Sequence, residues 1–121
     1  MGYHSFEDLD VWKKACALTV KLYKILKACQ DYGLKDQMTR AAVSIASNIA
    51  EGAERDTIPE FIRFLHIAKG SAAELRTQIY IAYKIDIISK VKKDELIEEI
   101  KSISSMLQGL IKHQKNKFHK S

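Results

Sequence analysis

Four polar residues carry the side-chain types and the spacing that chemistry would need. Ser44, Asn48, Glu51 and Arg55 follow one another at steps of four, three and four residues, and this spacing places them along one edge of a helix. A hydroxyl, an amide, a carboxylate and a guanidinium on one edge form either an interhelical polar network or a contact for a ligand or subunit. An enzyme acting here would need the edge to open onto a cleft.

Further polar residues are expected to join this polar stripe. Arg40 falls on the same side of the helix, and residues from a following helix are expected to face or flank it, namely Arg63, Lys69, Ser71 and Glu74. In the structural interpretation Glu51 pairs with Arg55 or with a basic residue of that following helix. The reason is that an unpaired buried charge is costly.

Established catalytic and metal motifs are absent from the sequence. A di-metal site in a helical bundle needs Glu three residues before His, and no histidine meets this condition, whether His4, His66, His113 or His119. Glycine-rich phosphate loops, H-E-x-x-H and G-x-S-x-G are also missing. We therefore predict a protein that is not an enzyme and that needs no metal or cofactor.

The two cysteines favour a reducing compartment. Cys16 and Cys29 lack C-x-x-C spacing, and on one helix they would lie about 20 Å apart, too far for a disulfide. We interpret them as small buried apolar residues. No apolar run reaches the length of a membrane span and the N-terminus lacks a signal-peptide pattern, so we expect a cytoplasmic protein that does not contact membranes.

Lysines are the second group of candidate functional residues. The formal net charge is +5, yet residues 1–56 carry equal numbers of basic and acidic side chains, so the excess lies in residues 57–121. Lys112, Lys115, Lys117 and Lys120 have no acidic neighbour and are the first candidates for binding an RNA or DNA backbone. The second candidates are Lys13, Lys21 and Lys24, which lie on the polar side of the first predicted helix. The alternative interpretation of this side is a solvated face with no binding role.

Hydrophobic residues at helical spacing predict the elements that position these side chains. The 121-residue chain suits one domain, and its single proline argues against an all-β fold. The periodicity predicts four helices, from Ser5 to about Cys29, from about Leu34 to Glu54, after a Thr57–Glu60 capping box, and from about Lys93. Gln30-Asp31-Tyr32-Gly33 is expected to end the first of them. Short connections favour an antiparallel up-down-up-down four-helix bundle.

Two segments outside the helix faces complete this prediction. Ile85, Ile87 and Ile88 are expected to close one end of the core in the turn between the last two helices. Beyond about residue 112 we expect a flexible basic tail. The first helix has a wider apolar arc than one bundle core requires, which indicates an interface, with Ile62 and Tyr80 as further candidates.

Several strings of residues resemble a known family over residues 5 to about 111. The sequence resembles small four-helix-bundle proteins encoded within intervening sequences of 23S ribosomal RNA genes, a bacterial-type family that also includes accessory proteins of diversity-generating retroelements. The matching strings are Phe6-Glu7-Asp8-Leu9, Val11-Trp12 with Ala15, Arg40-Ala41-Ala42-Val43-Ser44-Ile45, Asn48-Ile49-Ala50-Glu51-Gly52 with Arg55, Glu60-Phe61-Ile62-Arg63-Phe64-Leu65, and Ile67-Ala68-Lys69-Gly70-Ser71-Ala72-Ala73-Glu74-Leu75.

The resemblance implies a ring-like homopentamer and, for some relatives, nucleic-acid binding in partnership with a reverse transcriptase. It carries over no catalytic residues. The leading hypothesis is a homo-oligomeric scaffold that binds an RNA or DNA backbone through lysines repeated around the ring. The alternative is an oligomeric protein-interaction module that recruits a protein partner and does not bind nucleic acid.

Overall fold

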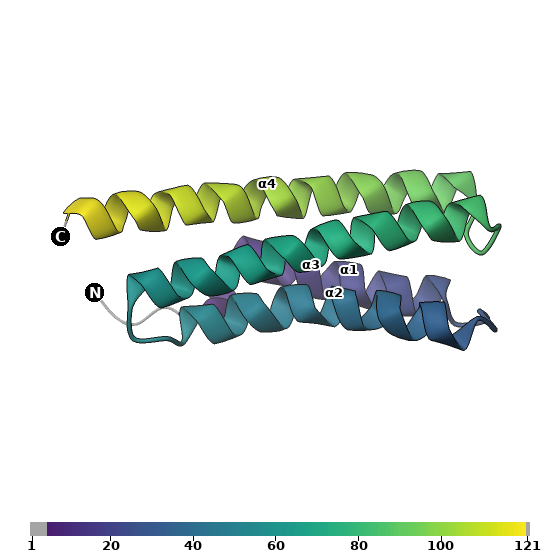
Figure 1. Ribbon diagram of the computed structural model, residues 1–121, viewed down its shortest axis with the longest axis horizontal. Coiled ribbons are helices and arrows are strands. Elements are labelled where there is room, and N and C mark those ends of the chain that lie inside the picture. The colour runs from purple at the N-terminus through teal and green to yellow at the C-terminus, as the bar shows by residue number, and fades with distance from the viewer. Residues whose placement is uncertain (1–4, 121) are drawn as a thin grey trace.

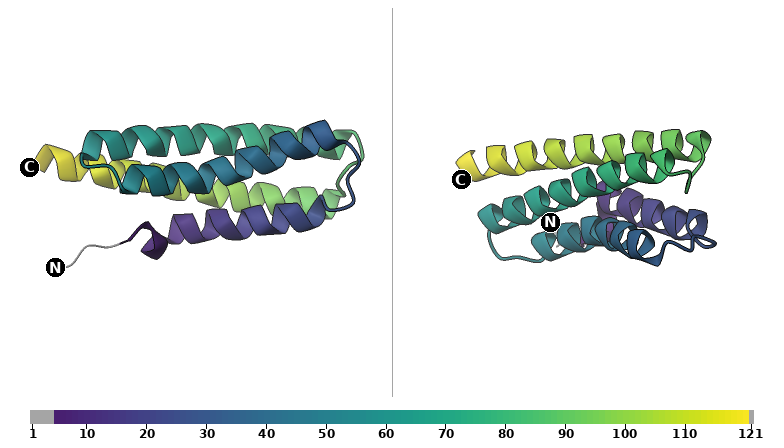
Figure 2. Two further views of the ribbon diagram at one scale, coloured as in Figure 1. Left: turned by 90° about the horizontal axis from the view of Figure 1, so that it is seen from below. Right: turned by 45° about the vertical axis from the view of Figure 1, so that its right-hand side comes forward.

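Four amphipathic segments form four α-helices in the computed structural model, which describes residues 5–120. A short 3-10 turn precedes them, and the elements in chain order are η1 (Phe6–Asp8), α1 (Asp10–Ile25), α2 (Tyr32–Ala53), α3 (Ile58–Lys84) and α4 (Lys90–Lys120). The helices alternate in direction, and the start of α1, the α2–α3 turn and the end of α4 lie at the same end of the molecule (Figures 1 and 2). The predicted up-down-up-down four-helix bundle is confirmed.

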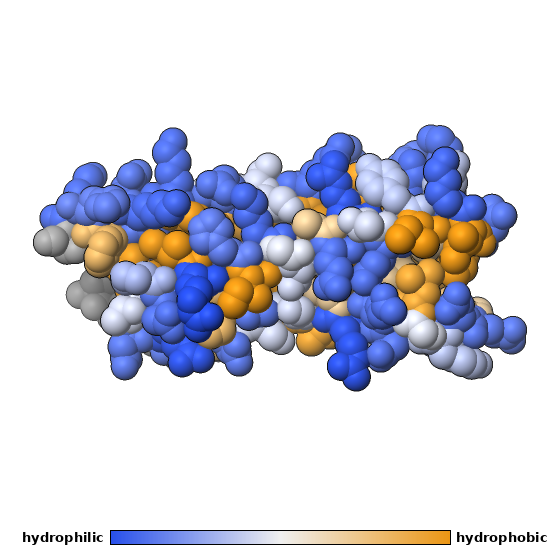
Figure 3. Space-filling view, in the orientation of Figure 1, coloured by the Kyte–Doolittle hydropathy of each residue, from blue (hydrophilic) through white to orange (hydrophobic). Residues whose placement is uncertain are grey.

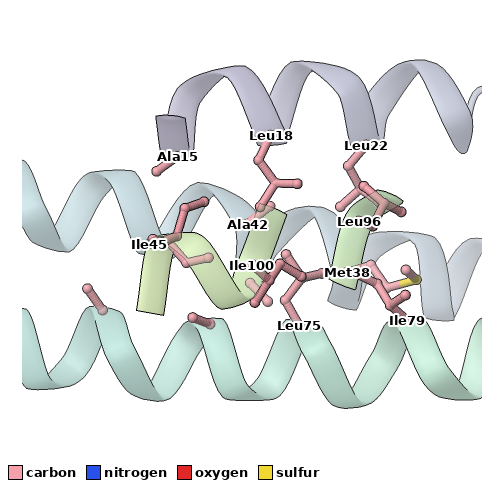
Figure 4. Packing of buried hydrophobic residues seen from close by; sticks show 14 of the residues in the cluster. Ala15, Leu18, Leu22, Met38, Ala42, Ile45, Leu75, Ile79, Leu96 and Ile100 are labelled. Carbon is pink, nitrogen blue, oxygen red and sulfur yellow. The ribbon is translucent and has the colours of Figure 1, made fainter. Parts of the chain in front are cut away.

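Each helix packs against two neighbours. α2 and α3 make the most extensive contact, α3 also packs on α4, and α1 packs on α2 and more sparsely on α4. Buried side chains from all four helices meet along the central axis, where Leu18 of α1, Ile45 of α2, Leu75 of α3 and Ile100 of α4 have almost no exposed surface (Figure 4). The outer faces of the helix pairs are therefore the surfaces available for function.

The first two helices begin and end at different residues from those predicted. Ser5 caps η1, and α1 ends at Ile25, so Cys29 lies beyond the helix in the α1–α2 turn. Asp31, which we expected to help end the first helix, instead accepts a hydrogen bond at its Oδ1 from Leu34 N at 3.1 Å. This cap starts α2 at Tyr32, two residues before the predicted start.

The third helix begins where it was predicted, whereas the fourth helix begins three residues before its predicted start at about Lys93 and continues through the predicted tail. Thr57 Oγ1 accepts a hydrogen bond from Glu60 N at 3.3 Å, which confirms the predicted start of α3. α4 begins at Lys90, after Ser89 Oγ accepts from Lys92 N, and it continues to Lys120. The basic tail that we expected to be flexible is therefore helical, and Gln114 within it is buried.

The α3–α4 turn closes the core with two of its three isoleucines. Ile88 is buried and Ile87 packs on the core, but Ile85 is exposed, so the expectation for Ile85 is wrong. The reason is the backbone of Asp86, whose φ of 64° reverses the chain in the left-handed region. No helix in residues 5–120 is long and apolar enough to cross a membrane.

Gly52 marks a close approach of α2 to α3. A Cβ atom added at Gly52 would lie 2.6 Å from Phe64 Cβ and 3.2 Å from the carbonyl oxygen of Phe61. Gly70 of α3 and Gly109 of α4 have no such neighbours within 4 Å. Among the glycines of residues 5–120, only Gly52 is therefore required by packing within one chain.

Candidate functional site

Half of the polar stripe forms a hydrogen-bonded network between α2 and α3. Ser44 Oγ and Ser71 Oγ lie 2.9 Å apart, and the Asn48 side-chain amide donates to Ser44 O at 2.8 Å and to Ser44 Oγ at 2.9 Å. All three residues are half-buried. This part of the stripe joins two helices, which supports the structural interpretation.

The charged residues of the stripe do not form the predicted pairs. Arg40 Nε pairs with Asp36 Oδ2 at 2.9 Å, one turn earlier on α2. Glu51 is exposed and makes no ion pair with any residue in the range 5–120, so the expected partnership with Arg55 or with a basic residue of α3 is wrong. Exposure explains the difference, since water solvates the carboxylate of Glu51 and no partner is required.

Arg55 packs on an aromatic ring. Its guanidinium carbon lies 4.7 Å from the centroid of the Phe64 ring, and that of Arg63 lies 4.6 Å from the same centroid. Arg63 is held in place by Glu60, whose Oε2 accepts from Arg63 Nε at 2.9 Å. This hydrogen bond lowers the pKa of Glu60. Arg55 and Arg63 therefore both pack on the Phe64 ring beside the α2–α3 turn. Glu74 of the predicted stripe is exposed on α3.

The end of the stripe borders an open hollow. Phe6, Ala50, Glu51, Glu54 and Arg55 line this hollow, which measures about 390 Å³. Its polar groups are two carboxylates and a guanidinium, and the lining includes neither Asn48 nor any histidine, cysteine or serine. Among residues 5–120, no group of three or more His, Cys, Asp or Glu side chains is placed to hold a metal ion.

Some of the lysines of α1 contact polar side chains of α4 and are not free to bind a ligand. Lys21 Nζ lies 3.2 Å from Glu99 Oε1 and 3.3 Å from Glu95 Oε2, and Lys14 Nζ donates to Ser102 Oγ at 3.1 Å. Partial burial lowers the pKa of Lys21, but the hydrogen bonds and charges of the two glutamates outweigh this effect and raise it. Lys21 is thus a structural partner of α4, whereas Lys13 and Lys24 remain exposed.

The four lysines at the end of α4 are exposed but face two directions. Gln108 contacts Lys69 of α3, and Lys112 and Lys115 follow Gln108 by four and seven residues, so both point to the α3 side. Lys117 and Lys120 follow Ser102, the partner of Lys14 on α1, at helical spacing and point to the α1 side. The tail is therefore two pairs of charges rather than one group.

An apolar groove runs between α1 and α2. Val20 of α1 is 54% exposed and Val43 of α2 is 42% exposed. The hollow between the helices measures about 440 Å³ and is lined by Phe6, Trp12, Cys16, Thr19, Val20, Val43, Ala46, Ser47 and Ala50. The wide apolar arc of the first helix is thus present as a surface. We did not predict that α2 contributes to this groove, although Val43 lies off the core-facing stripe of α2.

The two further candidates for an interface and the two cysteines differ in part from expectation in their burial. Ile62 packs partly on the core, whereas Tyr80 is exposed near Lys93. Cys16 and Cys29 are free and half-buried rather than fully buried. Burial raises the pKa of the Cys16 thiol, which keeps it protonated and unreactive at neutral pH.

Comparison with known proteins adds a family and a fold. A family model described as 23S rRNA-intervening sequence protein matches residues 7–109. The fold is similar to the crystal structure of a protein with unknown function from the S23 ribosomal protein family of Bacteroides thetaiotaomicron, with a TM-score of 0.79 and 24% sequence identity over 84% of this chain and 98% of that chain. Such identity supports the shared fold alone. No curated protein matches the chain.

Proposed function

This chain belongs to the family of 23S rRNA-intervening sequence proteins, and we propose that it acts as a non-enzymatic homo-oligomeric scaffold that binds the backbone of RNA or DNA through lysines. The observation that carries the proposal is the charge of α4. From residue 100 to residue 120 the helix contains five lysines and no Asp or Glu, while the only acidic side chains of α4 lie in its first ten residues. A rigid rod with positive charge at one end attracts a polyanion.

Self-association is supported by the apolar α1–α2 groove. Monomeric proteins rarely leave a contiguous apolar surface of this kind exposed. A second copy of the chain is the occupant that the family suggests, and a pentameric ring is the assembly we propose. Each protomer of a ring would present one set of lysines, and a long polymer that reaches several sets gains affinity through avidity. We place this scaffold in the cytoplasm, where nucleic acids are its partners.

A protein-interaction module is the second candidate function. The bundle end opposite the basic tail exposes Tyr32, Ile85 and Val91, which are 71%, 52% and 67% exposed. Figure 3 shows hydrophobic residues gathered over the α3–α4 turn at this end. This surface is compatible with a protein partner such as a reverse transcriptase. In that case the lysines would serve solubility only.

We expect replacement of Lys112, Lys115, Lys117 and Lys120 together by glutamine to weaken salt-sensitive binding strongly. The intact protein should bind a fluorescent ~30-nucleotide RNA or DNA in an anisotropy titration with a steep salt dependence, and the slope of log K against log salt should fall by about 0.9 for each phosphate contact that this group makes. All four side chains are exposed, so the variant should fold normally.

A matched variant of the same net charge shows whether binding depends on the positions of the lysines or on net charge alone. Replacing Lys27, Lys84, Lys90 and Lys92 by glutamine removes the same charge from exposed positions on the α1–α2 turn, the end of α3 and the start of α4. This variant should retain binding close to that of the intact protein. If the intact protein is oligomeric in light scattering and binds neither RNA nor DNA, the scaffold proposal is wrong and a protein partner becomes the better explanation.

A further inference from the structure

Basic side chains lie along the seam between α3 and α4, on a face that the sequence pattern did not single out. Lys69 Nζ of α3 contacts Gln108 Oε1 of α4 at 2.5 Å, and this contact shows which residues of the two antiparallel helices lie side by side. Arg76 lies seven residues after Lys69, and Lys101 lies seven residues before Gln108. Because the helices run in opposite directions, Arg76 and Lys101 sit beside each other on the same face.

The seam continues toward the α4 end. Lys112 and Lys115 follow Gln108 by four and seven residues and point to the same side, and His66 precedes Lys69 by three residues. From Lys101 to Lys115 the basic row spans about 21 Å at 1.5 Å per residue. We call this row the basic seam, which comprises Lys69 and Arg76 of α3 with Lys101, Lys112 and Lys115 of α4. Figure 1 shows the two helices side by side along this length.

The charges of the basic seam form no ion pair within residues 5–120. The ion pairs of α3 and α4 are formed by other residues, at Arg63–Glu60, at Lys21 of α1 with Glu95 and Glu99, and within the first turns of α4. Glu98 precedes Lys101 by three residues without an ion pair to it, Glu74 follows Ser71 by three residues on the side that faces α2, and α4 has no acidic residue after Glu99. Like charges held together with few counter-charges repel, so this arrangement costs stability that an anionic ligand would recover.

The shape of the basic seam selects among nucleic acids. Proteins that bind single strands place aromatic side chains beside the basic groove to stack on the bases. Residues 66–76 and 101–115 contain no Phe, Tyr or Trp, and the exposed aromatic residues next to them, Tyr80 and Phe118, lie beyond the two ends of the seam, so there is no stacking platform along its length. A straight row of cations on two rigid helices matches instead the phosphate rows of a double helix, whose bases are already stacked.

We propose that the basic seam is the binding site for the phosphate backbone of double-helical nucleic acid. The inference rests on the proposed function and narrows it in two respects. It assigns Arg76, Lys101 and Lys69 to the interface, and it keeps Lys112 and Lys115 there while excluding Lys117 and Lys120, which point to the α1 side. Duplex RNA and duplex DNA share the recognised chemistry, and the test distinguishes them.

The test compares two double charge reversals of equal net charge. Arg76→Glu with Lys101→Glu should weaken binding of a 20-base-pair duplex by about 10- to 100-fold and lower the salt slope by roughly 2, because two phosphate contacts are lost. Lys117→Glu with Lys120→Glu should leave binding within about threefold of the intact protein. Anisotropy titrations with duplex RNA, duplex DNA and the corresponding single strands measure both effects, and the duplexes should bind more tightly than either strand.

A second variant guards against misfolding, since Arg76 is half-buried. Lys101→Glu with Lys112→Glu changes two exposed positions of the seam and should weaken duplex binding to a similar extent, with the thermal melt and the light-scattering mass unchanged. If the Lys117–Lys120 variant loses binding and both seam variants retain it, the seam inference is wrong while the scaffold function stands. If single strands bind more tightly than duplexes, the duplex assignment is wrong. Absence of binding to every probe overturns the scaffold function itself.

Discussion

Replacing Gly52 with alanine will destabilise the fold by about 3 kcal/mol, because the new methyl group has no space. Its Cβ would lie 2.6 Å from Phe64 Cβ and 3.2 Å from the Phe61 carbonyl oxygen, both on α3. The ring of Phe61, whose Cδ1 would lie 3.0 Å away, can turn aside, but Phe64 Cβ and the Phe61 carbonyl move only with the helix. Relief therefore requires α2 and α3 to move apart along their most extensive contact. Urea unfolding followed by circular dichroism, at one protein concentration, measures the loss.

Gly70→Ala is the matched control for this prediction. Gly70 is exposed in the middle of α3, and an added Cβ meets no atom within 4 Å. Alanine should therefore stabilise the helix by about 0.5–1 kcal/mol, through its higher helix propensity. The two substitutions add the same methyl group and should have opposite signs. Similar destabilisation by both would contradict the close approach of α2 and α3 at Gly52.

The same helix contact explains the polar and small residues at the start of the polar stripe. In the string from Ser44 to Gly52, Ser44 and Asn48 form the hydrogen bonds that reach Ser71, and Ile45 and Ile49 are fully buried. Gly52 then permits the close approach. Each of these positions serves the packing of α2 on α3, so the string that most strongly indicates the family describes a helix interface rather than a reaction.

Local patterns predicted the elements because each depends on nearby residues. The Thr57–Glu60 cap and the buried faces of the four helices depend on spacing within one segment, and both were correctly predicted. Asp31 was misassigned because a polar cluster between two helices suits the end of one as well as the start of the next, and only the hydrogen bond to Leu34 N decides.

The functional surfaces were less predictable because they depend on how helices align. Lys21 looked like an exposed cation on α1, but the alignment of α1 with α4 brings it to Glu95 and Glu99. Arg76 and Lys101 were not predicted to lie together because they are 25 residues apart in the sequence. The packing of α3 on α4 brings them together, and the contact between Lys69 and Gln108 shows the alignment of the two helices. No sequence periodicity within one helix contains that information.

Charge reversal in the α1–α2 groove should have the second large effect, on assembly. Val20→Glu with Val43→Glu places two carboxylates in the apolar surface that we assign to self-association. Burying them against a second copy would cost several kcal/mol, so the dissociation constant should rise about a thousandfold or more. Multi-angle light scattering should show a shift from oligomer to monomer. Both side chains are about half exposed in the single chain, so its own fold should persist.

A control at the opposite end of the bundle makes the assembly result specific. Tyr32→Glu with Val91→Glu changes two exposed apolar residues by the same charge and should leave the oligomer intact. Dissociation by this pair alone would move the interface to that end, and a monomeric intact protein would contradict self-association. The groove variant also distinguishes the affinity of one protomer for nucleic acid from the gain in affinity when several protomers bind the same molecule. It retains the basic seam, so its affinity for a short duplex should be unchanged, whereas its affinity for a long duplex that spans several protomers should fall.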